Sequence, residues 1–494
     1  MNKIIYTCTK CDAQFSKWTG RCLECGSWGT VKESQISNRK SKILNKNVPA
    51  GKTMKFDHII GREVARLKTG IEEFDRVLGG GLAPGSLILL GGEPGIGKST
   101  LVLQIAAALS DVIPTDPDAK VGGVEGSLVN HESKGIPRLR PARRGSARND
   151  KTPITLYISG EESAEQVKLR FDRFGLEPRG LEFLGETNIE TVCATIDELR
   201  PALAIVDSIQ TMTTVENVGT GLKPVPTGSP TQLKIVCAKL METAKNSRTP
   251  IILIGHVTKE GGLSGPKTLE HLVDVVLYLE GDRFHQFRIL RAAKNRFGST
   301  DEAGIFEMTS AGLKEVLNPS AAFLSGRGEI VPGSVITCLM AGARPILLEI
   351  QALVSRTQFG YPQRRASGFD LNRLQVLIAV LAKRTGLPLE TYDVFLNVAG
   401  GLKADEPAAD LAAVLAMASA LKNKTLPLNL VAFGEVGLGG EVRAVSRMEK
   451  RVAEAKKMGF EFAVLPPTKE PLKISGIKLA HLKNVKEMIE KIVK

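Results

Sequence analysis

Long apolar runs are missing from this chain of 494 residues. No stretch of about 18 uncharged apolar residues occurs, which is the length that a membrane-spanning helix needs. The first residues, MNKIIYTCTKCDAQF, also lack the apolar core and the small-residue cleavage site of a signal peptide. We therefore expect a cytoplasmic protein without contact to a membrane.

Cysteine is scarce as well, with 7 residues in the whole chain. Four of them lie within the first 25 residues, whereas Cys193, Cys237 and Cys338 stand singly in apolar contexts. This distribution is typical of a reducing compartment and one metal site, and it argues against a disulfide scaffold. We expect the three single cysteines to be core residues.

The length and the 43% of hydrophobic residues predict more than one core, because single cores stop growing at roughly 250 to 300 residues. The formal net charge of +13 favours a polyanionic partner, since Lys and Arg displace the counterions condensed on phosphates. The chain is thus expected to hold two large domains with appendages and to bind nucleic acid.

Composition and periodicity divide the chain into four parts. Residues 1–30 are rich in cysteine, and residues 31–60 are polar and basic and are interpreted as a linker. Short apolar runs alternate with amphipathic stretches over 61–315, which predicts an α/β domain with a mostly parallel sheet. Residues 111–153 interrupt this alternation and are interpreted as an insertion. A second region of strands and helices, of α+β type, is expected over 316–494.

A glycine-rich loop is the strongest functional signal. The sequence GEPGIGKS matches the pattern G-x-x-x-x-G-K-[ST], directly after the apolar run SLILLGG and directly before an apolar helix. Its backbone N–H groups would converge on phosphate, while Lys98 reaches the β- and γ-phosphates and Ser99 ligates Mg²⁺. A chance glycine-rich turn is the alternative. The residues expected to bind ATP are Gly92, Glu93, Pro94, Gly95, Ile96, Gly97, Lys98, Ser99 and Thr100.

Carboxylates follow two other expected strands. LAIVD ends in Asp207, where it would position Mg²⁺ at the carboxyl edge of the sheet. ITLYISG runs into Glu161 and Glu162, one of which would polarise the attacking water. We favour Glu161 as the catalytic residue. Glutamates at a helix start also serve as caps, and this reading stands beside the catalytic one.

Three further polar residues follow apolar strands. His256 comes after PIILIG and either senses the γ-phosphate or is packed in the core. Lys294 and Arg296 follow FRILRAA, one residue apart, and point the same way if the segment is extended. Such a pair reaches a neighbouring subunit's ATP or grips DNA phosphate; a solvated basic loop is the alternative.

Near the N-terminus, Cys8 and Cys11 form one CxxC pair and Cys22 and Cys25 form another, with ten residues between the pairs. Two such knuckles predict a tetrahedral Zn²⁺ site, because so short a segment does not fold without a metal or a similar cross-link. A redox pair is the alternative.

With CxxC…CxxC, GEPGIGKST, SGEESAEQVKLR, LAIVDSIQT, GHVTKEG and KNRFG in this order, the sequence resembles the bacterial RadA/Sms family of recombination and repair ATPases over nearly its whole length. The resemblance implies a RecA-like core and a hexameric, DNA-dependent motor that promotes branch migration. It also implies single-stranded or branched DNA and a RecA-type recombinase as partners. Lys294 and Arg296 belong to the family's KNRFG motif, and residues 213–230 and 258–267 take the places of RecA-type DNA-contacting loops.

The C-terminal region resembles the proteolytic domain of Lon, which uses a Ser–Lys dyad. Glu406-Pro-Ala408-Ala-Asp410 stands where Lon has Gly-Pro-Ser-Ala-Gly, so a methyl group replaces the nucleophilic hydroxyl. Glu449 falls at the place of the lysine, with Lys450 one position away. The resemblance therefore implies a proteolytically inactive, Lon-like domain.

The insertion departs from the family pattern, since the phosphate-loop helix normally leads almost directly to the strand before GEES. Its basic half either adds a DNA contact or serves as a solvated tether. Two rival functions remain for the whole chain: an ATP-switched DNA-binding scaffold without motor activity, and an ATP-dependent protease.

Overall fold

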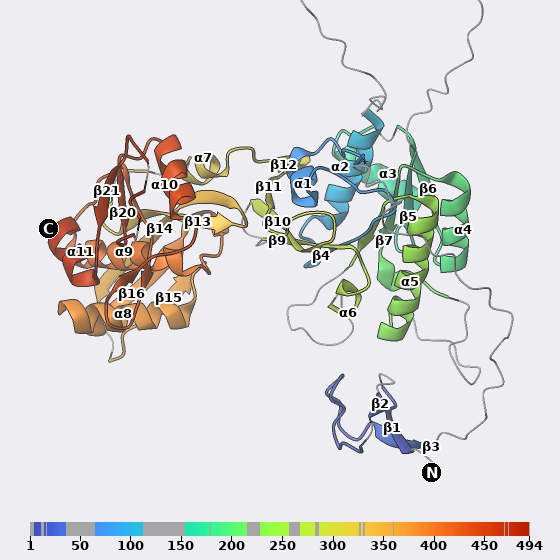
Figure 1. The fold of residues 1–494 in the computed structure, drawn as a ribbon, viewed down its shortest axis with the longest axis horizontal. Helices are drawn as coiled ribbons and strands as arrows, with labels where there is room; N and C mark the ends of the chain where they lie inside the picture. Colours follow the sequence, from blue (N-terminus) through green and yellow to red (C-terminus); the bar gives the residue numbers. More distant parts are fainter. Residues whose placement is uncertain are drawn as a thin grey trace, which may run out of the picture.

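The structure is a computed structural model, and it describes residues 4–10, 14–15, 17–35, 65–111, 154–177, 179–214, 228–255, 267–281, 286–325, 328–329, 331–358, 360–468, 470–472 and 474–493. Sheets of three, nine and seven strands organise these residues, and a two-stranded sheet accompanies the third (Figure 1). The insertion expected at 111–153 lies outside the described residues from position 112 onward.

The N-terminal module is a small antiparallel ribbon with the strand order β2-β1-β3. It consists of β1 (Ile4–Cys8), β2 (Gln14–Phe15) and β3 (Val31–Gln35). Because β3 pairs with β1 along its full length, residues 31–35 belong to the ribbon and not to the expected linker. The buried core of the ribbon is formed by Cys8, Cys22 and Val31.

The nine-stranded sheet has the order β12-β11-β10-β9-β4-β8-β7-β5-β6. The strands from β9 to β6 are parallel, and β10, β11 and β12 extend the sheet as antiparallel strands, so the prediction of a mostly parallel sheet is confirmed. The strands are β4 (Leu87–Gly92), β5 (Thr155–Ser159), β6 (Leu181–Leu184), β7 (Leu203–Asp207), β8 (Ile251–Ile254), β9 (Val275–Glu280), β10 (Phe287–Asn295), β11 (Ala303–Thr309) and β12 (Gly312–Glu315).

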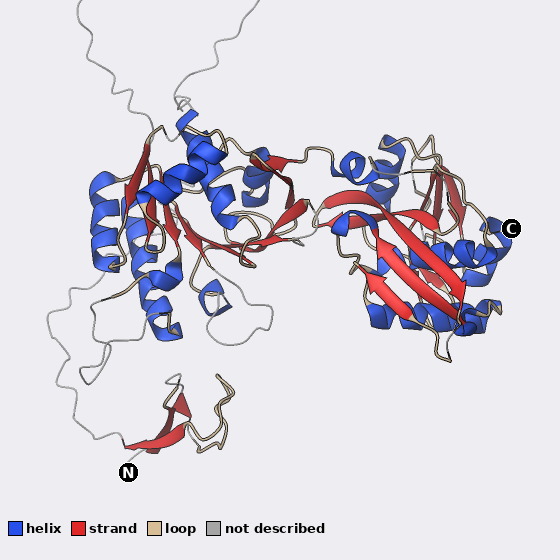
Figure 2. Ribbon diagram, turned by 180° about the vertical axis from the view of Figure 1, so that it is seen from behind, coloured by secondary structure: helices blue, strands red, loops and turns tan. Residues whose placement is uncertain are grey.

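Alternating side chains bury both faces of this sheet. Ile88 and Leu90 of β4 face one core, whereas Leu87 and Leu89 face the other, as the two-residue period of a strand requires. Figure 2 shows helices on the two sides of the strands. The first core is covered by α1 (Glu72–Leu78), α2 (Lys98–Asp111) and α3 (Ala164–Arg173), and the second by α4 (Ile189–Leu199), α5 (Pro230–Ser247) and α6 (Lys267–Glu270).

The C-terminal module has a mixed sheet of order β15-β16-β14-β13-β17-β20-β21, which confirms the expected α+β class. Its strands are β13 (Ser334–Ala341), β14 (Arg344–Arg356), β15 (Arg364–Ser367), β16 (Tyr392–Val398), β17 (Leu430–Ala432), β20 (Phe462–Leu465) and β21 (Lys478–His481), with the pair β18 (Glu435–Val436) and β19 (Val442–Arg443) beside them. Its helices are α7 (Pro319–Leu324), α8 (Leu371–Thr385), α9 (Asp410–Lys422), α10 (Met448–Lys457) and α11 (Val485–Ile492).

The two large modules share a hydrophobic core. Phe287 and Ile289 of β10 are buried together with side chains of the seven-stranded sheet and its helices. The ring of Phe287 meets the ring of Phe323 edge-on, with centroids 4.4 Å apart. Two ion pairs also cross the junction, from Arg344 to Glu73 at 3.0 Å and from Arg447 to Asp301 at 2.8 Å. The antiparallel end of the nine-stranded sheet therefore packs directly against the C-terminal module (Figure 1).

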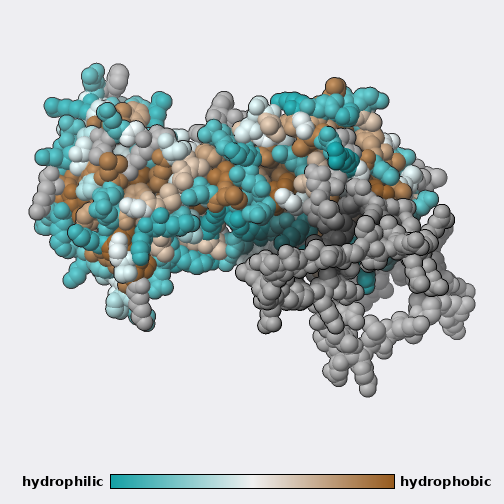
Figure 3. All heavy atoms as spheres, turned by 90° about the horizontal axis from the view of Figure 1, so that it is seen from above, coloured by the Kyte–Doolittle hydropathy of each residue, from teal (hydrophilic) through white to brown (hydrophobic). Residues whose placement is uncertain are grey.

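None of the helices in the described part of the chain combines the length and the apolar character that crossing a bilayer requires. On the face seen from above, the hydrophobic residues form small separate groups among hydrophilic ones (Figure 3).

Candidate nucleotide site and metal ribbon

The glycine-rich loop joins β4 to α2, as the motif predicts. Gly92 is the last residue of β4 and Lys98 the first of α2, with Ser99 and Thr100 in the first helical turn. The ammonium group of Lys98 donates to the carbonyl oxygens of Gly92 at 2.9 Å and of Glu93 at 3.0 Å. These bonds hold the start of the loop against the N-terminus of α2, where free backbone N–H groups can bind an anion.

The antiparallel strands support the loop from behind. Gly97 has a φ of +113°, a backbone conformation that residues with a Cβ atom rarely adopt, and a Cβ atom there would also lie 2.7 Å from Cε of Met308 on β11, so that the methionine would have to shift. Arg288 of β10 is buried, and its Nε donates to the carbonyl oxygen of Ile96 at 3.2 Å. The conformation of the phosphate loop thus depends on side chains that lie about 200 residues later in the sequence.

Asp207 stands at the carboxyl end of β7, two strands away from the loop. Its Oδ2 accepts a hydrogen bond of 2.7 Å from the hydroxyl group of Tyr157 on β5. Burial lowers the pKa of Lys98 to about 8, and the negative charge of Asp207 opposes this shift. Lys98 and Asp207 are therefore close enough for their charges to interact, and a Mg²⁺–triphosphate site places a lysine and a carboxylate near one another in this way.

The two glutamates after β5 differ in their surroundings. Glu161 is exposed, and its Oε1 accepts a hydrogen bond of 2.8 Å from the hydroxyl group of Ser208. Glu162 is half-buried and paired with Arg170 of α3, and burial raises its pKa against the effect of that arginine. Ser163 caps α3 with a full capping box, so neither glutamate is the cap itself. Glu161 therefore remains the better candidate for polarising water.

Lys294 and Arg296 both contact the short segment 270–274. The strand β10 continues to Asn295, so Lys294 lies on the strand and not in a loop after it. The ammonium group of Lys294 donates to the carbonyl oxygens of Glu270 and Val273, at 2.7 and 2.8 Å. Arg296 pairs with Asp274 at 3.2 Å. Lys294 is thus held against the end of α6, whereas Arg296 is exposed in the turn after β10 and pairs with Asp274.

Part of the expected site lies outside the described residues: His256, Cys11 and most of the two expected DNA-contacting loops, namely 215–227 and 258–266. Gly255, the last described residue before the second loop, follows β8 at the same sheet edge as the phosphate loop.

Three cysteines of the ribbon converge. The sulfur atoms of Cys8, Cys22 and Cys25 all lie within 4.8 Å of one another, and those of Cys8 and Cys25 are 3.7 Å apart. Tetrahedral Zn²⁺ with bonds of about 2.3 Å needs sulfur atoms about 3.8 Å apart, so the cluster has the right size. Backbone N–H groups of Lys10 and Cys25 also donate to the sulfurs of Cys8 and Cys22, at 3.4 Å each.

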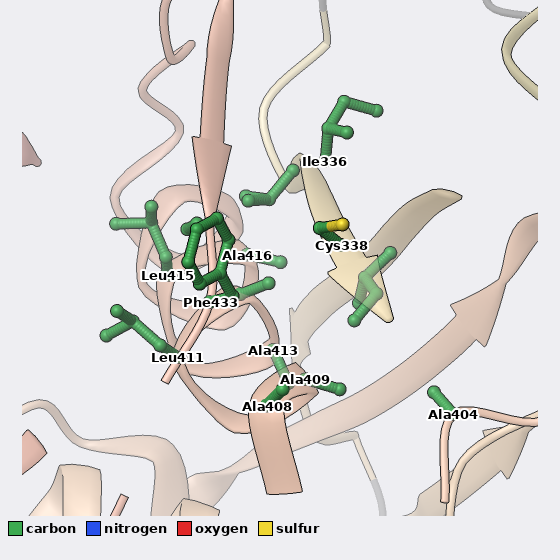
Figure 4. Packing of buried hydrophobic residues seen from close by; sticks show 14 of the residues in the cluster. Ile336, Cys338, Ala404, Ala408, Ala409, Leu411, Ala413, Leu415, Ala416 and Phe433 are labelled. Atoms are coloured by element: carbon green, nitrogen blue, oxygen red, sulfur yellow. The ribbon is translucent and has the colours of Figure 1, made fainter. Parts of the chain in front are cut away.

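The place of the Lon dyad is filled differently. Ala408 is fully buried among apolar side chains at the start of α9 (Figure 4), whereas Glu449 and Lys450 are exposed on α10. Arg451, also fully buried, forms an ion pair with Glu406 and donates to the carbonyl oxygen of Cys338. In the described residues, this position holds an ion pair between the buried Arg451 and the half-buried Glu406, and no nucleophile beside a lysine.

Four contributors were missed by sequence reasoning: Tyr157, Ser208, Arg288 and Asp274. Each acts through a hydrogen bond or an ion pair to a residue on another element. Only Ser208, next to Asp207, had a signal in the sequence.

Comparison with known proteins agrees with this architecture. Residues 6–33 match the rubredoxin metal binding domain, residues 53–262 an AAA domain, and residues 379–492 the Lon protease (S16) C-terminal proteolytic domain.

Relatives match along nearly the full chain. DNA repair protein RadA of Bacillus subtilis (strain 168) is 45% identical over 491 residues, which cover 98% of this chain and 97% of the relative. DNA repair protein RadA of Listeria monocytogenes serovar 1/2a is 42% identical over 466 residues, or 94% of this chain and 92% of the relative. The chain therefore belongs to the RadA family of DNA repair proteins, with an AAA domain between a metal-binding ribbon and a Lon-like domain.

Proposed function

We propose that this chain is a DNA-dependent ATPase that processes or branch-migrates recombination intermediates, acting as an ATP-driven motor on single-stranded DNA. The observation that carries the proposal is the convergence of Lys98, Asp207 and Glu161 at one edge of the nine-stranded sheet. Phosphoryl transfer needs little covalent chemistry from the protein, so charge and position supply most of the catalysis.

Each group has a defined part in this proposal. The loop from Gly92 to Thr100 holds the triphosphate, and Lys98 neutralises its β- and γ-oxygens. Ser99 and Asp207 position Mg²⁺. Glu161, oriented by Ser208, polarises the attacking water.

Two observations support DNA as a partner: the positive net charge of the chain and its membership of a family of DNA repair proteins. The chain has a formal net charge of +13, and its relatives bear the name of DNA repair proteins. We propose single-stranded or branched DNA as the partner, together with a RecA-type recombinase. Lys294 and Arg296 would reach ATP across a subunit boundary in a hexameric ring, in which hydrolysis changes the grip of two loops on DNA.

In this proposal the ribbon binds a structural Zn²⁺ ion, and the Lon-like domain has no catalytic role. The size of the cysteine cluster supports Zn²⁺, bound by Cys8, Cys11, Cys22 and Cys25. The buried Ala408 and the exposed Glu449 support a Lon-like domain without proteolytic activity, because an alanine cannot attack a carbonyl group.

The test is ATP turnover by the full chain with Mg²⁺, with and without single-stranded DNA, combined with the mass in solution in the presence of nucleotide. We expect turnover that DNA stimulates and a mass of several subunits. Lys98→Ala should lower turnover about 100-fold or more, as loss of a preorganised charge typically does.

A matched control is Lys168→Ala. Lys168 is an exposed lysine of α3 in the same module, paired only with Asp172 within its helix, so its loss should leave turnover unchanged. Normal turnover by Lys98→Ala would overturn the site. A single turnover that DNA does not stimulate would favour the ATP-switched scaffold, and ATP-dependent casein degradation would favour the protease.

A further inference from the structure

A tyrosine hydroxyl group is buried beside the carboxylate that the proposed mechanism assigns to magnesium. Tyr157 is fully buried in the middle of β5, and Asp207, which is 8% exposed, ends β7. Their hydrogen bond of 2.7 Å joins two strands directly at the nucleotide site. The sequence pattern explains the tyrosine ring as a core residue but gives no reason for its hydroxyl group.

The register of the sheet places this hydroxyl group. β5 and β7 are parallel neighbours, with Tyr157 opposite Ile205 and Ser159 opposite Asp207. Side chains two residues apart in a strand share a face, so the ring of Tyr157 lies below Asp207 on the face that α2 covers. The long side chain then reaches along the sheet to Oδ2 of the carboxylate.

The protonation state is fixed as well. The ordinary pKa of a tyrosine side chain, about 10, keeps the hydroxyl group protonated at physiological pH. A tyrosine hydroxyl group that faces a carboxylate oxygen must donate. A donor to a charged acceptor also makes one of the stronger hydrogen bonds in proteins.

We propose that Tyr157 is a positioning residue for magnesium: its hydroxyl group fixes Oδ2 of Asp207, so that the carboxylate would be held in one orientation when the ion binds. This inference rests on the proposed ATP and magnesium site. A carboxylate held by one oxygen loses its free rotation, and this preorganisation of the ligand strengthens ion binding. Without the donor, Asp207 would be only partly solvated and free to turn away.

The test removes the hydroxyl group alone. Tyr157→Phe keeps the aromatic ring in its core, so the fold should persist. Binding of the imido analogue of ATP is measured by calorimetry over a range of free Mg²⁺ concentrations and in EDTA. We expect the concentration of Mg²⁺ that gives half of the affinity gain to rise about three- to tenfold, as expected for the loss of one hydrogen bond to a charged group. Affinity in EDTA should stay the same.

The same sheet offers a matched control. The hydroxyl group of Tyr278 on β9 donates to Oε1 of Glu270, also at 2.7 Å, on the other face of the sheet. Tyr278→Phe therefore makes the same chemical change to a tyrosine–glutamate pair away from Asp207. It should leave the Mg²⁺ dependence as in the unchanged protein.

A double-mutant cycle decides whether Tyr157 acts through Asp207. In the presence of Asp207→Asn, Tyr157→Phe should cause no further shift in the Mg²⁺ dependence. Additive shifts would overturn the inference, and so would a Tyr157→Phe protein with unchanged Mg²⁺ dependence. If the unchanged protein binds the analogue equally well with and without Mg²⁺, the proposed site itself fails, and this outcome is distinct from the other two.

Discussion

Burial disfavours the charged form of Lys98, and bound ATP would favour it. Its side chain is only 4% exposed, and burial lowers its pKa to about 8 despite the nearby Asp207. In the protein without nucleotide, the ammonium group therefore loses its proton in the mildly alkaline range. Triphosphate places several negative charges beside it, and opposite charges raise the pKa of a lysine.

The pH dependence of ATP binding follows from this shift. The nucleotide-free protein lacks the Lys98 proton above pH 8, so ATP binding should take up roughly 0.9 proton per site at pH 9 and less than about 0.1 at pH 7. Affinity should fall as the pH rises above 8. Calorimetry in two buffers of different ionisation enthalpy measures the uptake. Lys98→Arg keeps its charge throughout this range, so any uptake that persists in this variant must come from another group.

At the scale of elements, β10 connects the phosphate loop, the core that the two large modules share, and α6. One face of the strand holds the phosphate loop through Arg288, and the other face carries Phe287 into the shared core. Its end holds α6 through Lys294. Because α6 follows the segment 258–266, the strand links the phosphate loop to the expected DNA-contacting loop.

Loss of the ammonium group at position 294 should loosen α6. Lys294→Met keeps the length of the side chain but leaves the carbonyl oxygens of Glu270 and Val273 without this donor. Amide hydrogen exchange of residues 269–274 should become about ten times faster, as measured by mass spectrometry.

The control for this experiment is Lys239→Met, which removes an ammonium group of α5 from its pair with Glu190 of α4. It should leave exchange at 269–274 unchanged. Unchanged exchange in Lys294→Met itself would show that α6 is held by other contacts.

Local pattern explains which elements the sequence predicts well. The strand and helix on either side of the glycine-rich loop, the strand that ends in Asp207 and the helix after Glu162 each carry their signal within about ten residues, and the structure has all of these elements. The bonds from Tyr157 to Asp207 and from Arg288 to Ile96 join residues 50 and 192 positions apart. They depend on strand order, which no local period encodes. The interpretation of residues 31–35 as part of a linker is wrong for the same reason, since the polar residues of β3 gain their order only by pairing with β1.

At the scale of the whole molecule, the shared core makes the Lon-like module part of the ATPase fold. Phe287, Ile289, Ala303 and Ile305 of the nine-stranded sheet are each no more than 8% exposed because the C-terminal module covers them. The buried Glu73 receives one of its two arginine partners, Arg344, from that module. Removing the module would uncover an apolar strand face and leave a buried carboxylate with fewer partners.

A chain that ends after Leu317 should therefore be less stable and should self-associate, with a lower midpoint of thermal unfolding and a larger mass by light scattering than a monomer. Adding Phe287→Thr and Ile289→Thr to the shortened chain should reduce the association, because threonine suits an exposed strand. The same two changes in the full chain should destabilise it by about 3 kcal/mol or more, since there they create cavities in the core. The two threonine substitutions should thus help the shortened chain to stay monomeric but destabilise the full chain, and this contrast is the critical comparison. A shortened chain that stays monomeric and unfolds at the temperature of the full chain would mean that the two modules fold independently.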